Sequence, residues 1–173
     1  VNVTPDSFFD GGRHSTLDTA LEHGRKLLAQ GADILDVGGE STRPGSEPVD
    51  AAEEIRRTRS VVQGLVSEGA VVTIDTRRAG VARAALEAGA HGVNDVEGLA
   101  DPAMIELCRE FGAGACAMHM RGDPRTMQNL PEYVDVVEEV EQFLRTASIR
   151  WKNAGLPPDA LALDPGVGFG KLP

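Results

Sequence analysis

Apolar residues recur three and four positions apart in five segments of the chain, which is the spacing of a helix with one buried face. Each segment is followed by a glycine, a residue that commonly ends helices. Asp50, with Glu53 three residues later, forms the capping-box pattern at the start of the second segment. The predicted helices are 17–30, the segment between Asp50 and Gly69, 79–88, 102–111 and about 131–153.

Short apolar runs lie between these helices and have the length of buried strands. The predicted strands are 1–3 (the tail of a first strand), 34–37, 71–74, 92–94, 115–118 and 161–163. Six short strands that alternate with five helices indicate βαβ units in a parallel sheet.

The polar residues at the strand ends distinguish two architectures for such a sheet. An open, doubly wound sheet gathers ligand groups at one switch point, whereas a barrel collects them from most of its strands. Nearly every predicted strand ends in a polar side chain: Asn2, Asp36, Asp75, Asn94, His119 and Asp164. We therefore predict an α/β fold of the (β/α)8 TIM-barrel class. A complete barrel takes about 250 residues, so we expect about six of its eight units, in one domain over residues 1–173 that is truncated at both ends.

Charge and composition narrow the classes of partner. The chain has 17 Lys and Arg against 27 Asp and Glu, a formal net charge of −10. Proteins that follow nucleic-acid phosphates or anionic membranes need a basic face, so we expect neither partner. No apolar run approaches the roughly 18 residues of a membrane span. The two cysteines, Cys108 and Cys116, form no spaced framework, and we expect a reducing, cytoplasmic setting.

Two polar loops are candidates for ligand binding. The loop after the first strand, residues 2–13, holds an amide, two acids and two hydroxyls that suit a metal or an anion. The loop over residues 38–45 reads GGESTRPG, in which glycines allow a ligand to approach the backbone. Its Arg43 offers a planar fork that fits a phosphate or a carboxylate.

Three acceptor side chains directly follow apolar runs: Asp75, Asn94 and Asp164. A carboxylate at such a place costs free energy unless a partner pairs with it. A buried salt bridge explains any one of them, but three on separate strands of one barrel face indicate a ligand rich in N–H donors. In contrast, we expect the acidic pair Glu53 and Glu54 to lie on a solvated helix face.

Six strings carry a resemblance to a known family. They are, in chain order, NVTPDSF at 2–8, DVGGESTRPG at 36–45, IDT at 74–76, NDV at 94–96, MHMRG at 118–122 and LDPGVGFGK at 163–171. Together they resemble the dihydropteroate synthase family, over the whole chain. The resemblance implies a TIM-barrel transferase that joins p-aminobenzoate to 6-hydroxymethyl-7,8-dihydropterin diphosphate and releases pyrophosphate. It also implies competition by sulfonamide drugs and a full-length homodimer.

The resemblance implies a role for each matching residue. Asn2 is the expected Mg²⁺ ligand, and Mg²⁺ the expected cofactor. The pterin-contacting positions are Thr42, Asp75, Asn94 and Asp164, with Met118 and Phe169 as walls of the pocket, and Asp10, Arg43 and Pro44 lie on loops that close over the substrates. We expect catalytic roles for Asp75, Asp10 and Arg43, with the Asp75 carboxylate stabilising a pterin methylene cation after early departure of the diphosphate.

Two alternatives remain open. One is a barrel that presents methyltetrahydrofolate to a corrinoid protein, which has no use for an STRPG anion loop or an Asn-bound Mg²⁺. The other is a non-catalytic homologue that keeps the fold. The resemblance places a pterin-contacting Lys and a diphosphate-binding Arg-x-His in units that we expect to follow Pro173.

Overall fold

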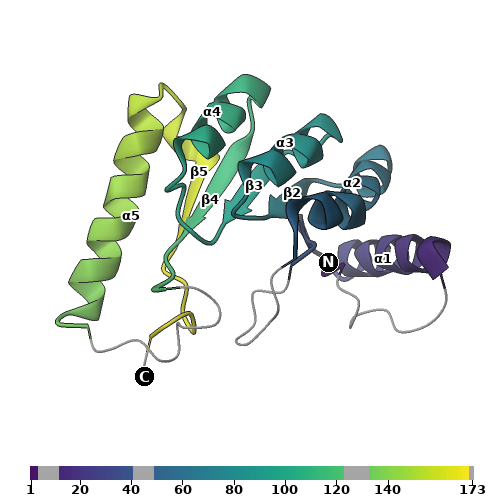
Figure 1. The fold of residues 1–173 in the computed structure, drawn as a ribbon, viewed down its shortest axis with the longest axis horizontal. Helices are drawn as coiled ribbons and strands as arrows, with labels where there is room; N and C mark the ends of the chain where they lie inside the picture. Colours follow the sequence, from purple (N-terminus) through teal and green to yellow (C-terminus); the bar gives the residue numbers. More distant parts are fainter. Residues whose placement is uncertain (4–11, 41–48, 123–132, 172–173) are drawn as a thin grey trace.

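The computed structural model describes residues 1–3, 12–40, 49–122 and 133–171 (Figure 1). Its centre is a five-stranded parallel sheet with the strand order β1-β2-β3-β4-β5. The strands are β1 (Leu35–Gly38), β2 (Val72–Asp75), β3 (Gly92–Asp95), β4 (Gly114–Met118) and β5 (Leu161–Asp164). Each strand therefore pairs with the next strand along the chain.

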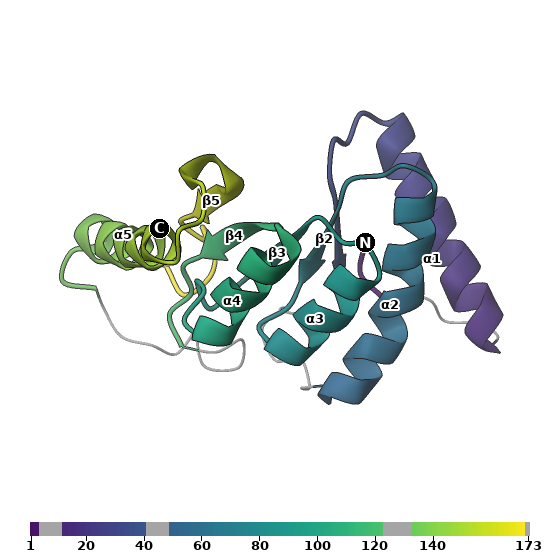
Figure 2. The same cartoon turned by 90° about the horizontal axis from the view of Figure 1, so that it is seen from above.

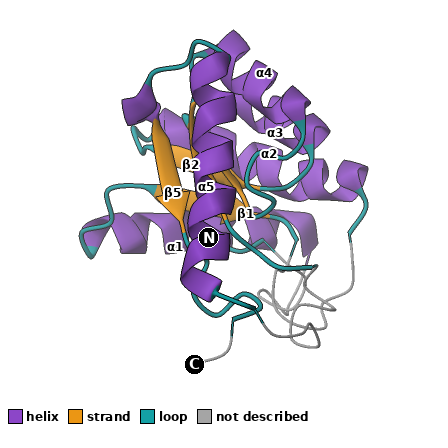
Figure 3. Ribbon diagram, turned by 90° about the vertical axis from the view of Figure 1, so that its left-hand side faces the viewer, coloured by secondary structure: helices purple, strands orange, loops and turns teal. Residues whose placement is uncertain are grey.

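A helix precedes β1 and each of the later strands. These helices are α1 (Gly12–Ala29), α2 (Ala51–Ser67), α3 (Ala79–Glu87), α4 (Pro102–Phe111) and α5 (Val136–Asn153), and the short 3-10 helix η2 (Pro158–Ala160) leads into β5. Seen from above in Figure 2, the helices follow one another around the curved row of strands. Figure 3 shows α5 standing in front of the sheet, at the β5 end of the row.

This neighbour-by-neighbour order distinguishes the two architectures that the sequence allows. The strand order of an open doubly wound sheet reverses at a switch point, and no reversal occurs among the described strands. The predicted α/β barrel class is confirmed, and the described strands form part of such a barrel. The expected first strand is present only as a parallel bridge between Asn2 and Gly38, with Val3 N donating to Gly38 O at 2.8 Å.

Two predicted helix starts were wrong. The first helix begins at Gly12 and not at residue 17, because the apolar stripe that guided the prediction starts later than the helix itself. The last begins at Val136 and not near residue 131. The Asp135 side chain caps it there by accepting hydrogen bonds from the backbone N–H groups of Val137 and Glu138.

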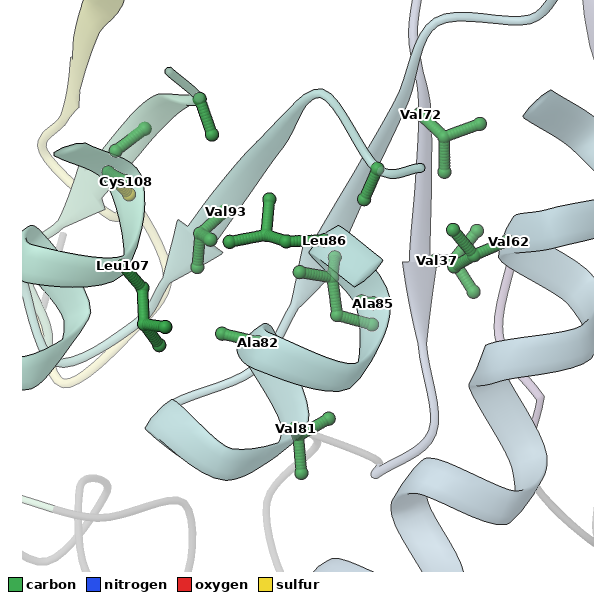
Figure 4. Packing of buried hydrophobic residues seen from close by; sticks show 14 of the residues in the cluster. Val37, Val62, Val72, Val81, Ala82, Ala85, Leu86, Val93, Leu107 and Cys108 are labelled. Atoms are coloured by element: carbon green, nitrogen blue, oxygen red, sulfur yellow. The ribbon is translucent and has the colours of Figure 1, made fainter. Parts of the chain in front are cut away.

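The core lies between the sheet and the helices (Figure 4). Val37, Val72 and Val93 point from three adjacent strands toward helix residues such as Val62 and Leu86, and all five are 4% exposed or less. Burying each such side chain contributes roughly 1.5–3 kcal/mol, so this layer fixes the strands in place. None of the described helices is long and apolar enough to cross a membrane.

Glycines bring α1 and α2 into close contact. A Cβ at Gly24 would lie 2.6 Å from Leu65 Cδ2, and one at Gly64 would lie 2.7 Å from Leu21 Cδ2. No larger residue fits at either position without movement of the neighbouring leucine.

Candidate functional site

The strand register places the predicted polar residues on one face of the sheet. In a strand, alternate side chains share a face, and registered neighbours on parallel strands share it too. Val37, Ile74 and Val93 face the helices and are fully buried. The opposite face, here called the inner face, carries Asp36 and Gly38 of β1, Thr73 and Asp75 of β2, Asn94 of β3, Cys116 and Met118 of β4, and Asp164 of β5.

Asp36 is the centre of the hydrogen bonding on the inner face. Thr73 Oγ1 donates to its Oδ1 at 2.6 Å, and Asn94 Nδ2 donates to its Oδ2 at 2.8 Å. The sequence predicted Asp36 as a strand-end residue and gave it no role in the site. It lies inside β1 instead. A carboxylate within an otherwise apolar strand was the signal that marks it.

Asn94 presents an acceptor that has no partner among the described residues. Its Oδ1 atom is buried and makes no hydrogen bond to the part of the chain that the structure describes. A buried amide oxygen left in this state costs about 1–3 kcal/mol. The atom is therefore placed for a donor that comes from outside the chain.

Asp75 is partly buried beside these groups. Burial, together with the smaller effect of the nearby carboxylates of Asp36 and Glu54, raises its pKa to about 7. The Asp75 carboxyl group therefore exchanges its proton near neutral pH, which ordinary aspartates do not. A ligand that donates N–H groups to this carboxylate would stabilise its ionised form.

The other end of the inner face is formed by β4, β5 and the turn after β5. Met118 is buried and lies in register with Asp164, whose Oδ1 accepts from Gly166 N at 2.7 Å. Lys171 holds the turn by donating from Nζ to the carbonyl oxygens of His119, Gly166 and Phe169, at 2.8–3.1 Å. The turn thus brings Phe169 to the same strand ends as Met118 and Asp164.

Cys116 lies on the inner face between Asp36 at one end and Asp164 at the other. Burial raises the pKa of its thiol to about 11, and the charges of Asp164 and Asp36 act in the same direction. Its thiol therefore lies within the electrostatic reach of both carboxylates. In contrast, His119 belongs to the opposite side, where its buried ring packs edge-on against Phe143 of α5 with 4.9 Å between the ring centres.

An ion-pair network that the sequence did not predict lies beside Asp75. Glu54 is 1% exposed, so the expectation of a solvated face was wrong for this residue. It accepts from Thr76 Oγ1 at 2.7 Å and forms an ion pair with Arg78. Arg78 also donates to Glu40 at 3.1 Å, and Glu40 accepts from Val49 N at 3.1 Å. The network connects the end of β2 to the two residues that flank segment 41–48.

Asn2 forms the parallel bridge with Gly38 of β1, and it is exposed. The described residues contain no group of three or more His, Cys, Asp or Glu side chains that would hold a metal. An exposed amide oxygen fits Mg²⁺ only if water and a phosphate supply the other ligands, which is the usual arrangement for this ion. Asp10, Thr42, Arg43 and Pro44 lie outside the described residues.

The inner face therefore presents acceptors to a ligand: the carboxylates of Asp75 and Asp164, and the Asn94 oxygen that has no partner among the described residues. Such a set suits a flat heterocycle with several N–H donors. A partly buried carboxylate also stabilises positive charge that develops on a bound ligand, because charges interact more strongly away from water.

Comparison with known proteins agrees with this chemistry. The family described as "Pterin binding enzyme" matches residues 1–173. The chain is 44% identical over 172 residues to the dihydropteroate synthase of Escherichia coli K12, which covers 99% of the chain and 61% of that protein. The chain thus spans about three fifths of the length of this relative.

Solved structures give the same result for the fold. The dihydropteroate synthase of Yersinia pestis, in a complex with a sulfonamide drug, matches with a TM-score of 0.88 and 42% identity. The enzyme of Xanthomonas albilineans, in complex with 7,8-dihydropteroate, matches with a TM-score of 0.85 and 40% identity. Both matches cover 99% of the chain, and they cover 62% and 60% of the respective structures.

Proposed function

The chain belongs to the pterin-binding enzyme family, and on that premise we propose that it carries the pterin site of a dihydropteroate synthase. This transferase condenses 6-hydroxymethyl-7,8-dihydropterin diphosphate with p-aminobenzoate to give 7,8-dihydropteroate and pyrophosphate, a step toward folate. The observation that carries the proposal is the Asn94 Oδ1 atom beside Asp75, which is buried and has no partner in the described ranges. A pterin supplies an amino group and ring N–H donors to such acceptors.

In the proposed reaction the protein binds the pterin ring and stabilises charge. Asp75, Asn94 and Asp164 accept from the ring donors, while Met118 and Phe169 pack against its faces. The C–O bond to the diphosphate breaks, and the electron pair leaves with the diphosphate. The ionised Asp75 stabilises the resulting methylene cation electrostatically. The aniline nitrogen then uses its lone pair to form the C–N bond and releases a proton to solvent water.

We assign the diphosphate and aminobenzoate to Asn2 and to the segments that follow the first predicted strand and β1 in the sequence. Asn2 would hold Mg²⁺ through its side-chain oxygen, and that ion would neutralise charge on the departing diphosphate. Thr42 stays the proposed substrate contact, and Asp10, Arg43 and Pro44 the proposed positions that close over both substrates. Their position in the sequence, after the first predicted strand and shortly after β1, supports this assignment.

The setting of the whole protein is part of the same proposal. The two cysteines, Cys108 and Cys116, are free, which fits a reducing compartment, and we place the protein in the cytoplasm. We also propose that the whole protein is a homodimer, which light scattering of the purified protein would test.

Pterin binding tests the proposal most directly. Isothermal titration with 6-hydroxymethylpterin should give binding in the wild type and none in Asp75→Ala. The control is Asp159→Ala, which removes an exposed carboxylate from η2 and should bind like the wild type. Retained tight binding by Asp75→Ala would overturn the role of this carboxylate.

A second assay separates an enzyme from a pterin-binding protein without this chemistry. Pyrophosphate release from the pterin diphosphate should depend on added p-aminobenzoate. Pterin binding without such release would point to a non-catalytic homologue, and binding of methyltetrahydrofolate in its place would favour the corrinoid-linked alternative.

A further inference from the structure

The Asp36 carboxylate connects three adjacent strands of the sheet. Both of its oxygens are occupied: Oδ1 accepts from Thr73 of β2 and Oδ2 accepts from Asn94 of β3. Thr73 lies in register with Asp36, and Asn94 lies in register with Asp75. Thr73, Asp36 and Asn94 therefore form one hydrogen-bonded group on the inner face, here called the relay.

The chemistry of the carboxylate decides which way the Asn94 amide points. A carboxylate only accepts hydrogen bonds, whereas an amide side chain has one end that donates and one that accepts. The NH₂ end of Asn94 must therefore face Asp36, and the oxygen must face away from it. This is the orientation that leaves Oδ1 buried and without a partner in the described part of the chain.

Thr73 holds the carboxylate in the rotamer that this orientation needs. Its hydroxyl has a single proton, and that proton is donated to Asp36 at 2.6 Å. Without the hydroxyl, one oxygen of Asp36 loses its donor and the carboxylate is free to rotate about its terminal torsion, which has no steep barrier. Rotation would weaken the bond to Asn94 and allow the amide to turn over.

We propose that Thr73 is a positioning residue that, through Asp36, fixes the Asn94 amide with its oxygen toward the ligand. The relay then makes the site selective for a ligand with an N–H donor at that point. The ligand class rests on the proposed function, but the orientation of the amide does not depend on it.

The test replaces Thr73 with valine, which keeps the shape and removes the hydroxyl. We expect Thr73→Val to bind 6-hydroxymethylpterin about 10-fold or more weakly, since hydrogen bonds to charged groups are worth roughly a tenfold change or more. Thr73→Ser keeps the hydroxyl and should bind within about threefold of the wild type. In the active protein the KM for the pterin diphosphate should rise, with kcat and the KM for p-aminobenzoate unchanged.

Thr58→Val is the matched control. Thr58 is buried like the core, and its hydroxyl donates to Glu54 O within α2 at 2.9 Å, away from Asn94. Thr58→Val removes the same hydroxyl group as Thr73→Val and leaves the three residues of the relay unchanged. If Thr73→Val and Thr58→Val have the same pterin affinity and KM values, the positioning role is refuted.

A ligand-free measurement keeps the inference separate from the proposed function. In ¹⁵N spectra, the side-chain NH₂ signals of Asn94 should shift and exchange faster with water in Thr73→Val, and not in Thr58→Val. Thr73→Ala serves in the same way if the valine variant does not fold. Unchanged Asn94 signals would refute the relay, whereas changed signals in a protein that binds no pterin would refute only the proposed function.

Discussion

The raised pKa of Asp75 predicts a specific effect of pH on stability. The pKa of this carboxyl group is about 7 in the folded chain, against an ordinary value of 3.8. The folded state therefore holds the proton more tightly than the unfolded state. Between these two values the unfolded chain is ionised and the folded chain is not, so stability falls as pH rises through this window.

The substitution Asp75→Asn removes this penalty, because an amide of the same shape does not ionise. Each pKa unit corresponds to about 1.4 kcal/mol, so the shift is worth roughly 4 kcal/mol above pH 7 as an upper figure. Well below the ordinary value of 3.8 the carboxyl group is protonated in both states and the penalty vanishes, and near pH 4 only a small part of the penalty is present. The variant should therefore gain stability over the wild type as pH rises from about 4 to about 8.

Urea unfolding followed by circular dichroism measures this difference directly. Wild type and Asp75→Asn are unfolded at about pH 4, 6 and 8, with Asp159→Asn as a control for the loss of an exposed carboxylate. The gain should be small at the lowest pH and largest at the highest. A constant difference between the two proteins at every pH would show that Asp75 titrates normally, and the electrostatic account of the site would fail.

Three further predictions follow from the same structure. Pterin affinity should increase in the wild type as pH rises through about 7, where Asp75 ionises, and should not change with pH in Asp75→Asn. Titration calorimetry below and above this pH measures the affinity, and a wild-type affinity that falls as pH rises would contradict the prediction. Glu54→Gln should destabilise the folded protein by about 2–3 kcal/mol, because it leaves Arg78 without its buried partner. Glu53 is more exposed, and Glu53→Gln should cost less than about 1 kcal/mol. Equal urea midpoints for the two variants would contradict this. Gly80→Ala, in open space on α3, should raise stability by about 0.5–1 kcal/mol. Gly64→Ala should raise it by less than Gly80→Ala, because the added Cβ displaces the Leu21 side chain; thermal melts that show an equal or larger gain at Gly64 would contradict this.

The sequence was sufficient for the order of elements, because apolar periodicity and terminal glycines are local signals. It was less reliable at helix starts such as Gly12, where the first turn carries no apolar stripe to mark it. The barrel class followed from the polar residues at strand ends, and the strand order agrees with it.

The sequence predicted those site residues whose neighbours in the chain indicate burial at a strand end. Asp75 and Asn94 were found because each follows an apolar run. Asp36 was placed at the wrong point of its strand, and its bonds to Thr73 and Asn94 depend on the register between strands, which no single segment encodes. The burial of Glu54 was also missed, because its partners Thr76 and Arg78 come from a different βα unit and the local sequence does not reveal them.

The pairing of each strand with its successor also has a consequence for how the chain folds. Among the described strands, the hydrogen bonds of the sheet join adjacent units, so β1 and β2 complete their pairing without waiting for α5 or β5. Contacts of short sequence separation close small loops, which costs less entropy and favours fast formation. The sheet is therefore suited to growth by one βα unit at a time from the N-terminal end, in step with synthesis of the chain.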